Sequence, residues 1–297
     1  MEEKMNISSS KHSRGENIFM VFNYAFLILI AFATFYPMYY VLVASFSNNS
    51  LLMQHTGLLL TPKGSSVAAY EKVFANPMIL RGYRNTLFIL VVGVFLALLM
   101  TSLAAYFLSR KNVYFKKPIM MAITFTMFFS GGMIPSYLNL RDLGLTNNLW
   151  GLIIPGMISV YNMIILRTSF QQIPESLTEA AIIDGAGHVQ ILFRIVLPLS
   201  QAILAVMILY YGIGIWNAWF WASAILRRRE LYPLQLILRE ILLQNSNLDV
   251  NVGSDVEGIS ETIKYATIIV ATIPVLCIYP FLQKYFAKGV MLGSIKE

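Results

Sequence analysis

Charge is scarce in this sequence of 297 residues and is absent from long stretches of it. Only 12% of the residues are Asp, Glu, Lys or Arg, while 57% are hydrophobic; a soluble domain carries about 25% charged residues. The windows of at least 18 residues without any charge are 17–62, 85–109, 118–140, 143–166, 195–226 and 265–283. Each can hold the roughly 20 apolar residues that cross a bilayer as a helix, and none shows the alternation of barrel strands. The sequence therefore predicts an all-α, polytopic membrane protein with six transmembrane helices.

Motifs for catalysis and for nucleotide binding are also missing. The dipeptide Gly-Lys does not occur, so there is no P-loop, and neither H-E-x-x-H nor G-x-S-x-G is present. The three histidines, His12, His55 and His188, are too widely spaced to predict a metal site. The single cysteine, Cys277, permits no disulfide within the chain and is expected to be buried in the last helix. We expect no enzymatic activity, no metal and no cofactor in this chain.

Ionisable side chains are absent from the middle of every predicted helix. Proton-coupled transporters commonly keep such groups as relays. Their absence disfavours proton coupling and leaves sodium coupling open, so the energy for any transport is expected to come from outside this chain.

The formal net charge of +7 could suggest a nucleic acid partner. The basic residues, however, form no single stripe and lie between the predicted helices, so we expect no nucleic acid partner. The loop after the second window holds Arg110, Lys111, Lys116 and Lys117, whereas the loop after the third holds only Arg141. Because short cytoplasmic loops are enriched in basic residues, we expect a multi-pass protein of the plasma membrane with both termini in the cytoplasm.

A single membrane domain with two short tails is the predicted organisation. Residues 1–17 form a polar cytoplasmic tail, residues 18–287 hold the six helices, and residues 288–297 form a second cytoplasmic tail. The first apolar window is about twice the length of the hydrophobic region of a signal peptide. We therefore expect it to remain as the first transmembrane helix.

The third, fourth and fifth helices carry specific expectations. Gly131–Gly132 and Pro135 weaken the third helix near its end. Such a break lies either within the membrane, against protein or a water-filled cavity, or at a simple helix end at the interface, and both possibilities stay open. The fourth helix is predicted over 149–167 and the fifth over 198–226.

A short amphipathic segment, EAAIIDGAGHVQILFRIVLP, separates those two helices. Ser176 and Glu179 have the spacing of a capping box, so a helix is expected over 176–184. Gly185 can supply the left-handed turn that ends this helix. A second short piece then leads to Pro198, where the fifth helix begins.

This segment resembles the EAA motif of ABC importer permeases. The positions in register are Glu179, Ala180, Ala181, Gly185, Ile195, Leu197 and Pro198, and the fuller sugar-permease form is also met by Asp184, Ala186 and Phe193. The resemblance covers nearly the whole chain and is strongest to the smaller six-helix permease of the maltose-type carbohydrate uptake family. The stretch GGMIPSYLNLRDLGLTNNLWGLIIP is most similar to the branch that serves oligosaccharides and polysaccharides.

The resemblance implies a type I ABC importer permease fold in which residues 174–198 are the coupling helix for a separate ATPase. Glu179 would pair with a basic residue of that ATPase, with helix capping alone as the alternative. Ala180 and Ala181 would permit its close approach, and Gly185 would hold the bend. ATP and Mg would be bound by the ATPase. The implied partners are a second homologous permease, two copies of the cytoplasmic ATPase, an extracellular solute-binding protein and the lipid bilayer.

Polar and aromatic residues of the fifth helix suggest a substrate path. Tyr210, Gly214, Asn217 and Trp221 recur at i, i+4, i+7 and i+11, which places them on one face of a continuous helix. Asn162 in the fourth helix is a further candidate. Aromatic faces and an amide suit a sugar, and the alternative is helix packing together with an interfacial aromatic belt.

The outer segment 227–262 is long for a connection between two membrane helices. We expect it to dock the solute-binding protein, with a disordered connector as the alternative. The function expected from the whole sequence is the permease subunit of an ATP-driven carbohydrate importer, with oligosaccharides as the expected cargo. An ABC permease for a non-sugar solute, or a secondary transporter or channel that works without an ATPase, are the alternatives.

Overall fold

The structure, a computed structural model, describes residues 14–248 and 260–294, and no strand occurs within them. Its elements in the first half are α1 (Arg14–Ser45), α2 (Asn49–Met53), α3 (Ala68–Ala75), α4 (Pro77–Ser109), α5 (Lys116–Phe128), α6 (Met133–Asp142), α7 (Trp150–Ile153) and η1 (Ile154–Gly156). Those in the second half are α8 (Val160–Phe170), α9 (Glu175–Ile183), α10 (His188–Ile191), η2 (Leu192–Val196), α11 (Leu197–Leu199), α12 (Gln201–Trp216), α13 (Phe220–Ile225), η3 (Arg229–Leu231), α14 (Leu234–Leu248) and α15 (Ser260–Ser294).

Helices long and apolar enough to cross a membrane account for most of the chain. Three are single helices, over Gly15–Ser45, Pro77–Ser109 and Glu261–Ile278. Three more are bent pairs: α5 with α6 at 112°, α7–η1 with α8 at 46°, and α10–α11 with α12 at 88°. If each bent pair crosses as one span, the described residues hold the six spans that the charge-free windows predict. The break between α5 and α6 falls at Gly131–Gly132, where Gly132 has a φ of 87°.

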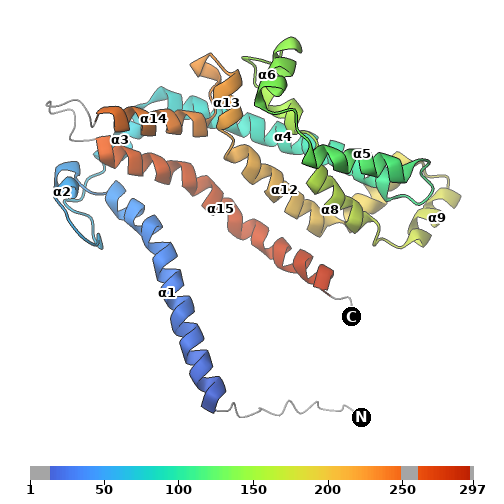
Figure 1. The fold of residues 1–297 in the computed structure, drawn as a ribbon, viewed down its shortest axis with the longest axis horizontal. Helices are drawn as coiled ribbons and strands as arrows, with labels where there is room; N and C mark the ends of the chain where they lie inside the picture. Colours follow the sequence, from blue (N-terminus) through green and yellow to red (C-terminus); the bar gives the residue numbers. More distant parts are fainter. Residues whose placement is uncertain (1–13, 249–259, 295–297) are drawn as a thin grey trace.

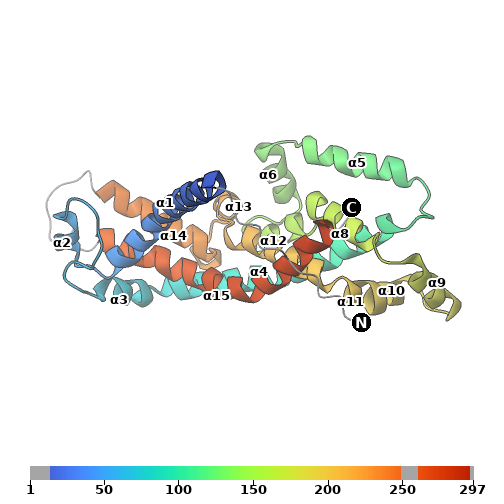
Figure 2. The ribbon, with the colours of Figure 1, turned by 90° about the horizontal axis from the view of Figure 1, so that it is seen from below.

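Helix α4 runs through the centre of an elongated body and contacts α8, α12 and α14. Figures 1 and 2 agree that α2 and α3 lie at one end of this body and α9 at the other. Within the apolar interior, the hydroxyls of Thr101 on α4 and Tyr211 on α12 share a hydrogen bond of 2.6 Å. The Tyr211 hydroxyl also accepts from the backbone N–H of Ser159 at 3.1 Å. Polar contacts of this kind hold helices together where lipid offers no hydrogen-bond partner.

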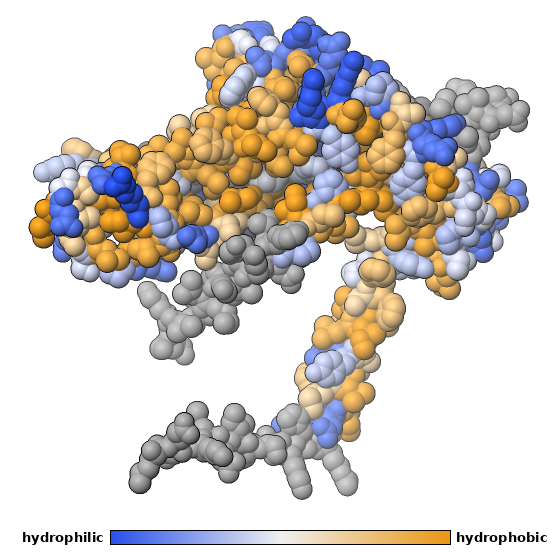
Figure 3. All heavy atoms as spheres, turned by 180° about the vertical axis from the view of Figure 1, so that it is seen from behind, coloured by the Kyte–Doolittle hydropathy of each residue, from blue (hydrophilic) through white to orange (hydrophobic). Residues whose placement is uncertain are grey.

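Helix α1 projects away from the body as an apolar arm (Figure 1). None of its apolar window, 0%, is buried within the chain. Hydrophobic side chains cover much of the arm, and also much of the body face seen in Figure 3. Because such a surface is stable only against lipid or another protein, α1 is available to a partner helix.

The fourth and fifth helices differ from the prediction of continuous spans over 149–167 and 198–226. The fourth breaks between η1 and α8, after Pro155, which cannot continue a regular helical hydrogen-bond ladder. The fifth bends at Ser200 and ends at Trp216. The side-chain amide of Asn217 donates to the carbonyl of Ile213 at 3.1 Å, and such local bonds compete with helix continuation.

The outer segment also differs from the long connection predicted over 227–262, because it contains helix α14. Leu234, Ile237, Leu238 and Ile241 follow helical spacing and pack against α3, α4 and α15. Pro233 precedes the helix, where its missing N–H costs nothing. Residues 249–259 lie outside the described residues.

Two smaller expectations are wrong or altered at the ends of the chain. Cys277 is exposed in the single chain rather than buried, because the stretch of α15 around it makes little contact with the body. The predicted tails, 1–17 and 288–297, are partly helical, since α1 begins at Arg14 and α15 continues to Ser294; their remaining residues lie outside the described ones.

Candidate functional site

A bent segment over residues 174–198 forms one end of the molecule. It consists of α9, a tight turn, α10, the π-helical stretch η2 and α11. Gly185 has a φ of 82°, the left-handed turn that the sequence predicts. The N–H groups of Gly185 and Ala186 donate to the carbonyls of Ile182 and Ala181, both at 2.9 Å, which closes α9 in a Schellman arrangement.

The start of α9 differs from the predicted capping box. The helix begins at Glu175 after Pro174, and no side chain caps it. Ser176 therefore lies inside the first turn, where its hydroxyl is not in the capping position. Glu179 is exposed and forms no hydrogen bond or ion pair with the described residues. Its carboxylate is free to meet another chain.

Two faces of α9 have opposite surroundings. Glu179, Ala180 and Asp184 are exposed, as is the large side chain of Ile183, which is 86% accessible. Thr178 and Ala181 face inward and are buried. Ala181 thus packs within its own chain and does not line the outer surface, which corrects the expectation that both alanines face a partner.

Contacts from the end of α4 hold α9 in place. The guanidinium of Arg110 donates from Nη1 to Oγ1 of Thr178 at 3.0 Å and lies 4.6 Å from the centre of the Tyr106 ring. The Tyr106 hydroxyl shares a hydrogen bond of 3.2 Å with Nδ1 of His188. Both halves of the bent segment are therefore tied to α4. The sequence offered Arg110 only as a topology signal, because nothing local marks a partner 68 positions away.

An exposed ion pair joins Lys111 to Glu175 beside these contacts. The hydrogen bond and the negative charge of Glu175 raise the pKa of Lys111 above its usual range. An exposed pair of this kind contributes little to stability, so the buried Thr178 contact is the more important link.

The second half of the segment leads directly into the membrane helices. Pro198 lacks an N–H and its ring would clash with the carbonyl four residues earlier, and the wider π-helical turn of η2 precedes it. Ile191, Leu192 and Val196 are buried in the same core cluster as Leu166 and Phe170 of α8. Ile195 and Leu197 are half-buried, whereas Pro198 is exposed. The bent segment thus shares one packed core with α8 and α12.

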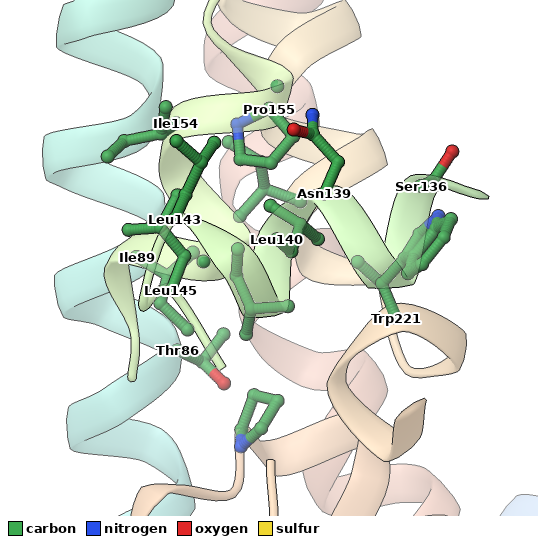
Figure 4. A pocket seen from close by; sticks show the side chains of 16 residues that line it. Thr86, Ile89, Ser136, Asn139, Leu140, Leu143, Leu145, Ile154, Pro155 and Trp221 are labelled. Atoms are coloured by element: carbon green, nitrogen blue, oxygen red, sulfur yellow. The ribbon is translucent and has the colours of Figure 1, made fainter. Parts of the chain in front are cut away.

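A cavity of about 500 Å³ lies toward the other half of the molecule. Figure 4 shows that it is enclosed by side chains from α4, α6, the α7–η1 turn and α13. Ser136, Asn139 and Thr86 supply polar atoms, and Trp221 supplies an aromatic face. The broken third helix lines this cavity through α6, which agrees with the first of the two possibilities left open by its glycines.

The predicted substrate-path residues are not brought together on one face. Trp221 lines the cavity from α13, on a different helix from Tyr210 and Gly214 of α12. Asn217 caps the end of α12 and is exposed, while Asn162 is buried on α8. The one-face geometry is wrong because the fifth helix breaks after Trp216, and the role of these residues in transport stays a prediction.

Two residues beside the cavity hold its walls in place, and neither was a candidate in the sequence. Asn147 has a φ of 55°, and its Oδ1 accepts from the backbone N–H groups of Arg227 and Arg228 at 3.1 and 3.0 Å. On α4, Thr86 Oγ1 accepts from the N–H of Leu234 at 2.8 Å. Asn-Asn in a loop is a weak turn signal, and nothing local predicted these partners. Among the described residues, no group of three or more His, Cys, Asp or Glu could hold a metal ion.

Comparison with known proteins gives consistent relatives. The family model described as "Binding-protein-dependent transport system inner membrane component" matches residues 7–292. The polygalacturonan/rhamnogalacturonan transport system permease protein YtcP of Bacillus subtilis (strain 168) is 39% identical over 282 residues, 94% of this chain and 98% of that protein. Protein LplC of the same organism is 37% identical over 293 residues, 98% of this chain and 99% of that one.

A solved structure has the same fold. It is a chain of a bacterial ABC transporter involved in the import of the acidic polysaccharide alginate, with a TM-score of 0.86 and 35% sequence identity. The match covers 94% of the present chain and 100% of the other. The family model, which matches residues 7–292, spans the candidate membrane helices and the bent segment.

Proposed function

The chain belongs to the family of binding-protein-dependent transport system inner membrane components, and on that premise we propose that it imports oligosaccharides as one permease subunit of an ATP-driven complex. It is a multi-pass membrane permease and not an enzyme. The hydrolysis of ATP, with its Mg, belongs to a partner ATPase in this proposal.

The observation that carries the proposal is the bent segment 174–198. Its outer face presents Glu179, Ile183 and Asp184 to solvent, while its inner face is fixed to α4 and α8 by hydrogen bonds and a packed core. A surface patch with one large apolar side chain and flanking carboxylates suits a cleft in another protein. Closure of two ATPase copies would displace this segment as a unit and change the angle between α8 and α12.

A second homologous permease completes the proposed complex. Helix α1 supports it, because its apolar surface is left uncovered by its own chain. The solute-binding protein would dock at the opposite end of the body, where α2, α3 and α14 lie (Figure 1). In this proposal the bent segment and both termini lie on the cytoplasmic side, and the basic residues of the loop 110–117 support that orientation.

An oligosaccharide is the proposed cargo because relatives covering nearly the whole chain are named for carbohydrate polymers, polygalacturonan/rhamnogalacturonan in one case and the polysaccharide alginate in the other. The cavity beside Trp221 and Asn139 supports this, since its lining offers an aromatic face, one side-chain amide and no charged side chain. A non-sugar solute is the alternative cargo, and it would be favoured if the transporter moved amino acids or peptides in preference to sugars.

Reconstitution tests the coupling. The complete complex is placed in proteoliposomes with ATP inside, and uptake of labelled oligogalacturonides and of neutral oligosaccharides is measured with wild type and with Gly185→Asp. The wild type should accumulate sugar only with ATP, and the variant should lose ATPase binding and uptake together. Equal ATPase binding by both proteins, or uptake without ATP, would contradict the proposal.

A further inference from the structure

Three cations surround the carboxyl end of α4 in a small volume. Lys116 Nζ donates to the carbonyl of Arg110 at 2.7 Å, and Arg167 Nε donates to the carbonyl of Leu108 at 3.0 Å. Arg110 and Arg167 are both close enough to Lys116 for their charges to repel it. Three elements, α4, α5 and α8, thus bring their basic side chains to one place, which we call the cation cluster.

No carboxylate balances the cation cluster among the described residues. The neighbouring acid, Glu175, is paired with Lys111, and Arg110, Lys116 and Arg167 take part in no ion pair with the described residues. The terminal carbonyls of α4 supply a partial negative charge equivalent to about half an elementary charge. Most of the positive charge therefore remains uncompensated, and an anion bound there would relieve the repulsion.

Two exposed aromatic side chains stand next to the cation cluster. Tyr114 is 88% and Phe115 79% accessible, although both lie in the loop 110–115 between two membrane-spanning elements, α4 and α5. Phe115 also has a φ of 56°, a conformation that bulky residues rarely adopt. A six-residue loop between two spans cannot leave the bilayer surface, and tyrosine and other aromatic side chains are typical of that region.

We propose that the cation cluster, with Lys117 at its rim, binds the phosphate headgroup of an anionic phospholipid while Tyr114 and Phe115 rest at the headgroup–acyl boundary. Guanidinium and ammonium groups are the usual ligands of phosphate oxygens. The anionic lipids of the cytoplasmic leaflet attract basic side chains beside membrane helices. The binding site itself does not depend on the proposed function; only the assignment to the cytoplasmic leaflet does.

Arg110 connects the proposed lipid site to the bent segment 174–198. The same guanidinium that would meet the phosphate donates to Thr178 of α9. An occupied site would hold Arg110 in this orientation and keep α9 docked on α4. Anionic lipid is therefore expected to improve the coupling between ATP hydrolysis and transport.

The test uses the full-length chain in mild detergent and native mass spectrometry with three probes: phosphatidylglycerol, phosphatidylcholine with the same acyl chains, and inorganic phosphate. Wild type should bind phosphatidylglycerol at least fivefold more tightly than phosphatidylcholine. Lys116→Gln/Lys117→Gln should lose most of this preference, while the matched control Arg141→Gln/Lys63→Gln, far from the cluster, should keep it within twofold.

Further variants keep the test decisive. Lys117→Gln alone alters only an exposed side chain and should still weaken phosphatidylglycerol binding about twofold. Tyr114→Ala/Phe115→Ala should weaken both lipids alike. The proposal is wrong if both lysine variants bind phosphatidylglycerol as wild type does, or if phosphatidylcholine binds equally well. It is also wrong if inorganic phosphate displaces the lipid at matched concentration, which would indicate a site for a free anion. Lipid binding that appears only with the ATPase present would likewise contradict it, because the site would then belong to a protein surface.

Discussion

Arg110 and Thr178 lie 68 positions apart in the sequence and are joined by a hydrogen bond of 3.0 Å from Nη1 to Oγ1. Arg110 follows the last residue of α4, and Thr178 is buried on the inner face of α9. The bond therefore connects α4, the helix at the centre of the body, to the segment that we propose takes force from the ATPase. It predicts that α4, in addition to α8 and α12, moves with that segment.

Replacing Thr178 by valine keeps its shape and removes the hydroxyl that accepts from Arg110. We expect the complex to assemble, with a loss of stability of about 1–2 kcal/mol, and the number of sugars moved per ATP hydrolysed to fall severalfold. Uptake and phosphate release measured in the same proteoliposomes check this. Glu175→Gln, which breaks only the exposed pair with Lys111, is the control and should behave as wild type; equal losses in both would show that the bond has no special part.

Gly185 and Gly187 form a matched pair in the turn of the coupling segment. A Cβ would meet no atom at either position, but Gly185 has a φ of 82°, whereas Gly187 has an ordinary φ of −74°. Gly185→Ala should therefore cost about 1 kcal/mol through backbone strain and weaken ATPase binding. Gly187→Ala should be neutral. Affinity is measured by pull-down with the ATPase, and equal behaviour of the two variants would remove the strain argument.

Ile183 is the most exposed large apolar side chain of α9, and its burial by a partner would contribute to affinity. Full burial of such a side chain is worth about 1.5–3 kcal/mol, so Ile183→Asp should weaken ATPase binding by tenfold or more. Ile183→Leu should retain it. The melting temperature of the chain alone should not change in either variant, because the side chain makes few contacts within its own chain. A wild-type affinity for the aspartate variant would place the docking face elsewhere.

Asn147 has two separable roles beside the cavity: its left-handed backbone and its side-chain acceptor. Asn147→Gly retains the backbone freedom and loses the bonds to Arg227 and Arg228, whereas Asn147→Ala loses both. We expect the melting temperature to fall for both variants because the two hydrogen bonds are lost. It should fall further for alanine, since strain in the left-handed backbone lowers the free energy of unfolding by about 1 kcal/mol more. Thermal unfolding in detergent measures the order; alanine as stable as glycine would show that the backbone conformation relaxes at no cost.

Trp221 supplies the aromatic wall of the cavity. Trp221→Ala should raise the KM for sugar uptake severalfold and leave ATPase binding unchanged, because the cavity is far from the coupling segment. Tyr210→Ala on the surface of α12 is the comparison. Should only the Tyr210 variant be impaired, the path would run along α12 rather than through the cavity.

Hydropathy made the membrane class and the number of spans predictable, since a bilayer requires about 20 uncharged residues per crossing whatever the tertiary structure is. The bent shape of segment 174–198 was predictable for a related reason. Gly185 permits a local left-handed turn, and the spacing of the glutamate, alanines, glycine and proline is contained within twenty consecutive residues.

The breaks in the spans and the partners of the key side chains were decided only by the tertiary structure. An apolar side chain is equally compatible with lipid whether its helix is straight or bent. The hydropathy of the run 195–226 therefore did not predict the bend at Ser200 or the helix end at Trp216. The amphipathic pattern of α14 was present in the sequence, but its partners on α4 and α15 are distant in the chain. The contacts of Arg110 and the clustering of Lys116 with Arg167 likewise exist only because three helices end at the same place in space.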